Sequence, residues 1–105
     1  MAHRFDPQQQ IDGQGRLVQA RGPVEHGEEM FWILALIWQN RGPGDYAAAW
    51  GTGSWANGKT QQWHCQTTMV GANTFHTGAA KAWALAEVTD DGGVFFRWPD
   101  DVTLV

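Results

Sequence analysis

Residues 28–44 read EEMFWILALIWQNRGPG and contain the most apolar stretch of the chain. Both alternating sets of this run are hydrophobic: one holds Met30, Trp32, Leu34, Leu36 and Trp38, and the other holds Phe31, Ile33, Ala35 and Ile37. The β-branched and aromatic content favours a strand over a buried helix, and the turn residues 40–44 end it. Because both faces of such a strand need cover, one of the two sets requires a partner beyond the core of its own sheet.

Short apolar segments separated by Gly, Pro, Asn and Asp continue on either side of this run, which indicates an all-β domain. We expect strands to start at seven positions: Arg16, Glu29, Tyr46, Thr60, Ala79, Val94 and Val102. This number and spacing predict a two-sheet antiparallel sandwich of about seven strands. The 105-residue length allows one domain, predicted over residues 15–105, and the polar residues 1–14 predict a flexible N-terminal tail.

Alternation within the later segments predicts which side chains form the core. One set faces inward on residues 60–70, namely Trp63, Cys65, Thr67 and Met69. The alanine set of residues 79–88 is small enough for close packing, whereas Trp83 and Leu85 share their face with Lys81 and Glu87 and are expected to lie outside. Among the seven tryptophans, we expect Trp63 and Trp98 in the core, with Trp32 or its neighbours on the long strand.

Several segments together resemble small immunoglobulin-like sandwich domains of uncharacterised bacterial proteins. The resemblance rests on five features: a short strand ending at Arg21-Gly22, the long apolar strand ending at Gln39, Trp63-His64-Cys65, Phe75-X-X-Gly78 before the alanine-rich strand, and Asp101-Val102-Thr103-Leu104. It implies an immunoglobulin-like fold and no activity. Such domains usually carry a second, early cysteine that forms a bridge, but residues 24–27 contain none.

Composition argues against several classes of partner. The formal net charge is −4, and the seven Lys and Arg residues form no basic stripe, so we expect no nucleic acid partner. The longest apolar run, residues 30–38, is about half of the roughly 20 residues that a membrane-spanning helix needs, so we expect no membrane insertion. As given, the sequence indicates a cytoplasmic protein, although a secreted chain without its export signal would look the same.

We expect neither a catalytic site nor a metal or cofactor site. His64 and Cys65 are adjacent on a strand and point to opposite faces, while His26 and His76 have no His or Cys at ligand spacing. The single cysteine, Cys65, is expected to be a small buried hydrophobe, and the carboxylates fall mostly in turns. The sequence therefore predicts a protein that is not an enzyme.

Two binding functions are compatible with this pattern. The first is a protein-interaction or assembly module that packs on another copy or another subunit through Phe31, Ile33 and Ile37, or through Trp83 and Leu85. The second is a carbohydrate-binding module that stacks sugar rings on Trp50, Trp55 and Trp83. The two apolar faces of the long strand favour the protein partner.

Overall fold

The computed structural model describes residues 4–23, 30–53, 62–88 and 94–105. These residues form seven strands and one 3-10 turn: β1 (Gln8–Asp12), η1 (Gly13–Gly15), β2 (Leu17–Pro23), β3 (Met30–Asn40), β4 (Tyr46–Gly53), β5 (Gln62–Val70), β6 (Gly78–Val88) and β7 (Val94–Leu104). The all-β prediction is therefore confirmed. None of the described residues belongs to a helix that is long and apolar enough to cross a lipid bilayer.

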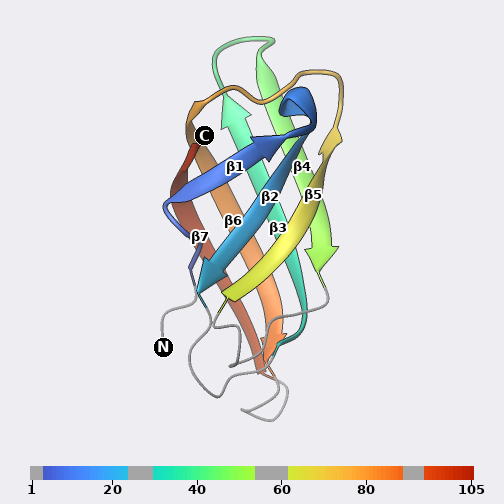
Figure 1. The fold of residues 1–105 in the computed structure, drawn as a ribbon, viewed down its shortest axis with the longest axis vertical. Helices are drawn as coiled ribbons and strands as arrows, with labels where there is room; N and C mark the ends of the chain where they lie inside the picture. The colour runs from blue at the N-terminus through green and yellow to red at the C-terminus, as the bar shows by residue number, and fades with distance from the viewer. Residues whose placement is uncertain (1–3, 24–29, 54–61, 89–93) are drawn as a thin grey trace.

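The strands form one closed barrel in the order β1-β2-β5-β4-β3-β6-β7 (Figure 1). All ladders are antiparallel except the one that closes the barrel, where β1 and β7 run parallel and pair Gln8 with Thr103 and Gln9 with Leu104. In Figure 1, β1, β2 and β5 lie in front of β3 and β6. The prediction of a two-sheet antiparallel sandwich is therefore wrong.

The ladder between β3 and β4 is one physical reason for the barrel. An immunoglobulin-like sandwich divides its seven strands, in chain order, between a sheet of strands 1, 2, 5 and 4 and a sheet of strands 3, 6 and 7. The same succession occurs here, but β3 and β4 pair continuously from Ile33 opposite Gly53 to Asn40 opposite Tyr46. This ladder joins the two sets on one side, and the β1–β7 ladder joins them on the other.

The expected flexible tail is also wrong for the residues that the structure describes. Phe5 is buried in the core, and β1 occupies residues 8–12. Polar composition concealed this strand, because its inward position is filled by Gln9, which is fully buried. Strand β2 pairs with both β1 and β5, so the closed barrel gives it two neighbours.

Two strands are longer than the sequence suggested. Residues 94–105 were expected to form two short strands interrupted at Pro99, yet β7 is continuous through Pro99. Likewise, β4 continues to Gly53, although glycine is depleted from strand interiors. A proline interrupts a strand only where its missing N–H is needed for a ladder, and at Pro99 β7 pairs with β6 alone, because β1 pairs with β7 only at Thr103 and Leu104.

The barrel interior is filled by large rings on some strands and alanines on others. Trp63 is fully buried and packs edge-on against Phe5 and Trp98, with ring centroids 5.1 and 6.1 Å apart. The inward alanines of β6 lie among the buried residues: Ala80, Ala82, Ala84 and Ala86. Small side chains on one strand leave room for indole rings from others, as close packing of a narrow barrel requires. The predictions for Trp63, Trp98 and the alanine set are thus confirmed.

Candidate interaction surface

A continuous apolar surface covers the outside of four neighbouring strands, β4, β3, β6 and β7. We call it the apolar face and define it by these outward side chains: Trp32, Leu34, Leu36, Trp38, Ala48, Trp50, Trp83, Leu85, Phe95 and Pro99. Outward positions alternate with the buried ones, because successive side chains of a strand point to opposite sides. The apolar face is therefore separate from the core.

The strand register aligns the side chains of the apolar face in rows. In the central row, Leu36 of β3 lies opposite Trp50 of β4 on one side and Trp83 of β6 on the other, and Trp83 lies opposite Pro99 of β7. Side chains opposite one another on adjacent strands have Cβ atoms about 5 Å apart and touch. The row therefore makes an unbroken apolar band across four strands.

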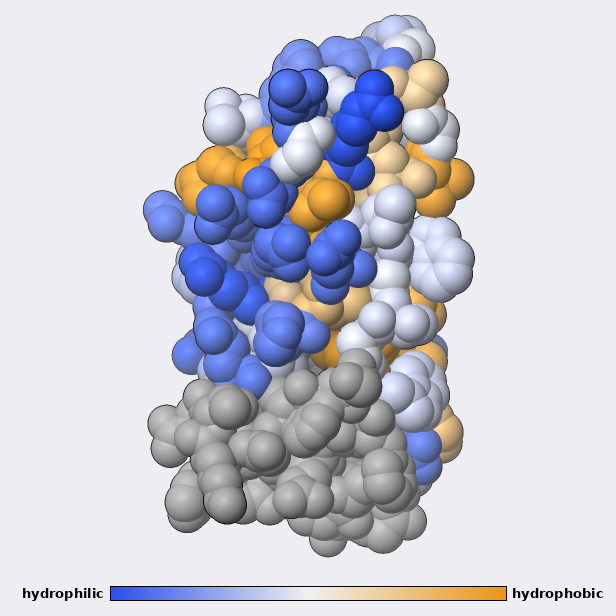
Figure 2. Space-filling view, turned by 45° about the vertical axis from the view of Figure 1, so that its right-hand side comes forward, coloured by the Kyte–Doolittle hydropathy of each residue, from blue (hydrophilic) through white to orange (hydrophobic). Residues whose placement is uncertain are grey.

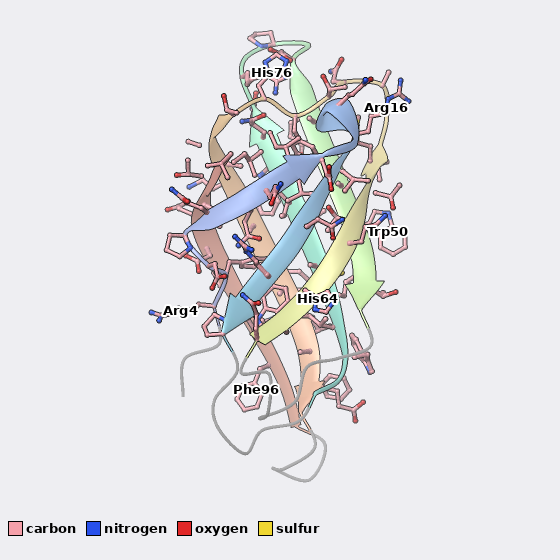
Figure 3. The ribbon with its side chains drawn as sticks, viewed as in Figure 1. Arg4, Arg16, Trp50, His64, His76 and Phe96 are labelled. Atoms are coloured by element: carbon pink, nitrogen blue, oxygen red, sulfur yellow. The ribbon has the colours of Figure 1, made fainter. Side chains whose placement is uncertain are left out.

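Exposure is greatest at the two margins of this face. Trp50 of β4 is 52% exposed and Phe95 of β7 is 57% exposed, whereas the side chains of β3 and β6 between them are half-buried by their neighbours. Trp50 points away from the barrel on the β4 side in Figure 3. Large aromatic groups at such positions are typical of contact surfaces.

The opposite side of the barrel is polar. Outward side chains on β1, β2 and β5 include a cross-strand series in which the exposed Gln10 lies opposite the half-buried Gln19, and Gln19 lies opposite the exposed Gln66. His64 of β5, labelled in Figure 3, belongs to the same side. In Figure 2 the hydrophilic side chains gather on the left of the view, and paler and more apolar ones occupy the right. The outer surface of the barrel is thus two-sided.

Charged groups border the apolar face at both ends of its strands. At one end, Lys81 of β6 forms an exposed ion pair with Asp101, opposite it on β7. At the other end, Glu87 accepts a 3.1 Å hydrogen bond from the indole Nε1 of Trp32, whose ring packs edge-on against Phe95 at 6.0 Å. Arg97 lies between these ends, opposite Leu85. The face therefore has a polar rim that carries both signs of charge.

A shallow hollow of about 360 Å³ lies at the Lys81 end of the face. Its lining residues include Trp38, Asn40, Ala79 and the Lys81–Asp101 pair. A flat ring beside amide, amino and carboxylate groups can hold a ligand that has both an apolar face and hydroxyl groups.

The structure brings together part of the predicted site. Trp83 and Leu85 lie on the outside of β6, and Trp50 joins them through Leu36. Ile33 and Ile37 are fully buried inside the barrel, so no partner can reach them, and the expectation that they bind one is wrong. Trp55 and the side chain of Phe31 lie outside the described residues.

The set that sequence reasoning missed is the other face of the same strand. Trp32, Leu34, Leu36 and Trp38 point outward, and Trp32 is therefore not in the core. The expectation for Trp32 is corrected because the inward phase of β3 belongs to Ile33, Ala35 and Ile37. One signal was available, since Trp38 and Leu36 share a phase with Asn40, which is exposed.

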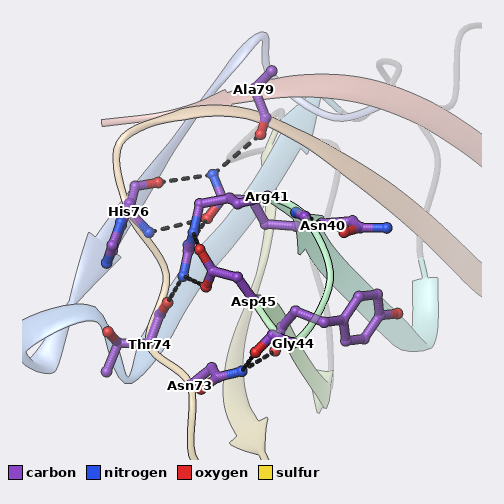
Figure 4. Close-up of polar contacts among 11 residues, drawn as sticks. Asn40, Arg41, Gly44, Asp45, Asn73, Thr74, His76 and Ala79 are labelled. Atoms are coloured by element: carbon purple, nitrogen blue, oxygen red, sulfur yellow. Dashed lines mark hydrogen bonds and ion pairs between the residues drawn. The ribbon is translucent and has the colours of Figure 1, made fainter.

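A polar cluster at one end of the barrel has a structural role (Figure 4). The Arg41 guanidinium donates to both carboxylate oxygens of Asp45, at 3.0 and 2.6 Å, and to the Gln39 side chain and the Thr74 carbonyl. Gln39 in turn donates to the carbonyls of His76 and Ala79 and accepts from the His76 backbone N–H. These bonds connect the β3–β4 turn to the segment before β6. Arg41 uses its guanidinium donors in these bonds, which gives it a structural role.

In the described part of the chain, the side chains that a catalytic or metal site would need do not come together. Cys65 is buried, as predicted, and burial raises the pKa of its thiol to about 11, which keeps it protonated and unreactive. Among the described residues, no three His, Cys, Asp or Glu side chains approach closely enough to hold a metal ion. His64 and His76 are exposed on separate parts of the surface (Figure 3).

No protein-family model, curated protein or solved structure matches this chain.

Proposed function

We propose that this protein is a non-catalytic interaction module that associates with a second copy of itself through the apolar face. The observation that carries the proposal is the central row of Trp50, Leu36, Trp83 and Pro99 across four strands. The interior of the barrel is filled by a different set of residues, so this row does not serve the core. Contiguous apolar surface with a polar rim supports a protein-contact role.

Sedimentation velocity at micromolar concentration tests this proposal. We expect the wild-type protein to sediment as a dimer and Leu36→Lys to sediment as a monomer, because a charge at the centre of the contact would be buried without a partner. Gln66→Lys, which places the same charge on the polar side, is the matched control and should remain dimeric. A wild-type protein that is monomeric across the micromolar range contradicts the proposal.

Carbohydrate binding is the second candidate, favoured by the hollow beside Trp38 and the exposure of Trp50. A sugar ring would stack on an indole while Asn40, Lys81 and Asp101 bond its hydroxyl groups. Titration with a panel of polysaccharides should then shift the tryptophan emission of the wild-type protein, and should shift it less in Trp38→Ala and Trp50→Ala. An emission spectrum that no polysaccharide changes removes this candidate.

A further inference from the structure

The charges around the apolar face restrict how two copies can meet. Four rows of side chains cross the strands, and the first contains Lys81 and Asp101, the second Trp83 and the third Leu85. Glu87 lies in the fourth row, three rows from Lys81 on the same strand. Lys81 and Glu87 are therefore about 20 Å apart within one copy, at about 3.3 Å per residue.

Two sheets that pack face to face about a two-fold axis have two simple arrangements. If the axis runs along the strands, each row meets the same row of the second copy. The order of the strands across the face is then reversed, so that β3 of one copy covers β6 of the other. Lys81 then lies over Trp38 of the second copy, and Glu87 lies over its Trp32. This arrangement buries the Glu87 carboxylate against an indole ring with no cation of the second copy opposite it, which is unfavourable, whereas Lys81 over Trp38 makes a cation–π contact.

If the axis runs across the strands, each strand covers its own copy in the opposite direction. With the axis between the second and third rows, Trp83 lies over Leu85 of the second copy, Leu36 over its Leu34, and Lys81 over its Glu87. On β3 and β6 the apolar side chains of the second and third rows meet one another, and two opposite-charge pairs form by symmetry. On β7, Pro99 lies over Arg97 of the second copy and Asp101 lies over its Phe95. Arg97 of the second copy then lies one row from Asp101.

We propose that two copies pack through the apolar face about a two-fold axis perpendicular to the strands, with Lys81 of each copy paired with Glu87 of the other. This inference rests on the proposed self-association and specifies its geometry. Charge complementarity selects this axis over the other, because it alone places a cation of the second copy over Glu87, and Lys81 then lies between two carboxylates, Asp101 of its own copy and Glu87 of the other.

The size of the face suits a dimer of moderate affinity. Four strands about 4.8 Å apart and four rows of side chains give a footprint of roughly 500 Å² in projection. This is smaller than the roughly 800 Å² per partner of a standard interface. We therefore expect dissociation in the micromolar range.

Exchanging the two charges between copies tests the axis directly. K81E and E87K should each weaken the dimer by about tenfold or more, because each places like charges opposite one another twice. An equimolar mixture of the K81E chain and the E87K chain should dimerise as well as the wild type, since both trans pairs then have opposite signs. Positions 81 and 87 of the same chain lie three rows apart, so the recovery cannot come from a charge pair within one chain. Sedimentation velocity of each variant and of the mixture measures all three results.

The outcomes separate this inference from the proposed function. A wild-type dimer that neither single variant weakens, or whose single variants are weakened but do not recover on mixing, overturns the two-fold axis while self-association stands. A monomeric wild type overturns both.

The wild-type protein gives a second measurement if a variant fails to fold. Added salt should weaken the dimer, because salt screens the trans charge pairs. A dimer that salt leaves unchanged or tightens overturns the proposed pairing.

Discussion

At the residue scale, Gln9 shows how a polar side chain takes the place of backbone in this barrel. Its amide Nε2 donates to the carbonyls of Asp6 and Arg21, at 2.7 and 2.9 Å, and its Oε1 accepts from the Arg21 N–H at 2.8 Å. A side-chain amide has the same donor and acceptor as a peptide group, so Gln9 extends the pairing of β1 with β2 beyond Gln10 and Gln19. The fully buried Gln9 side chain therefore has hydrogen-bond partners for both its amide nitrogen and its amide oxygen.

Replacing Gln9 with leucine should lower the free energy of unfolding by about 2–4 kcal/mol, because the Arg21 N–H and the Asp6 carbonyl lose their partners. Urea unfolding followed by tryptophan fluorescence measures the change. Gln10→Leu is the matched control, since Gln10 is the exposed neighbour on the same strand, and it should stay within about 0.5 kcal/mol of the wild type. Equal effects of the two substitutions would contradict this account.

Asp45 should make stability depend on pH. The pKa of its carboxyl is lowered, first because it accepts hydrogen bonds from Arg41 and further because Arg41 and His76 attract its charge, against a smaller opposing effect of burial. A folded pKa below the unfolded value of about 3.9 stabilises the protein above that value, and this contribution is lost as the pH falls through the folded pKa.

Urea unfolding of the wild type and of Asp45→Asn at several pH values tests this dependence. We expect the wild type to be more stable by the same amount at pH 7 and pH 5, and the two proteins to converge as the pH falls below about 4. If the difference in unfolding free energy between the two proteins grew as the pH fell, the stabilisation by Arg41 would not depend on the charge of Asp45.

At the scale of elements, β4 shows why some strand limits were predictable and others were not. The alternation in β5 and in β6 identified the inward face of each strand correctly. The inward set of β5 contains Trp63, and the inward set of β6 consists of alanines. Glycine is depleted from strand interiors, yet Gly51 and Gly53 lie within β4, and β5 passes very close to both. A Cβ built at Gly51 would come within 2.2 Å of the Gln66 carbonyl oxygen. No local pattern reveals a contact with a residue fifteen positions away.

Gly51→Ala should therefore destabilise the barrel by about 1–3 kcal/mol, since the added methyl group must push β4 away from β5. Thr52→Ala, at the exposed position next to it, should change stability by no more than about 0.5 kcal/mol. Thermal unfolding of both variants measures the difference. A Gly51→Ala protein as stable as Thr52→Ala would mean that the two strands separate at no cost.

The residues of β3 give two opposing signals for its phase, because the polar Asn40 and Gln39 lie on opposite sides of the strand. Gln39 is in phase with Ile33 and Ile37, and a polar side chain normally marks the solvent side of a strand. Here Gln39 is buried, because the carbonyls of His76 and Ala79 accept its amide N–H groups. The side of β3 that is available to a partner, and hence four of the ten side chains of the apolar face, is decided by these long-range hydrogen bonds.

At the scale of the whole molecule, closure of the barrel depends on the N-terminal segment. Phe5 packs on Trp63, its N–H donates to a carboxylate oxygen of Asp100, and β1 fills the gap between β2 and β7. The sequence could indicate all-β structure but not closure, because the segment that closes the barrel has few apolar residues. Its contribution comes from the Phe5 ring, the buried Gln9 amide, Ile11, which packs against the core, and backbone pairing.

Deleting residues 1–12 should remove most of the stability of the fold. The truncated chain loses Phe5, worth about 3–5 kcal/mol as a buried ring, together with the β1 ladders, which is a large part of the 5–15 kcal/mol typical of a domain. We expect no cooperative unfolding transition in urea, and a red-shifted tryptophan emission as Trp63 becomes exposed. A truncated chain that unfolds at the wild-type midpoint would show that the closing strand is dispensable.

The parallel pairing of β1 with β7 has a consequence for the order of folding. The hydrogen bond from Phe5 to Asp100 spans 95 residues, whereas β3 and β4, or β6 and β7, are joined by short connections. The entropy lost on closing a loop grows with its length, so the local hairpins should form early and the seam between β1 and β7 last. Until that final step, β7 retains an open edge that β1 of any nearby chain can occupy. Refolding at high protein concentration should therefore yield strand-exchanged dimers that form only during folding, in competition with closure of the single barrel.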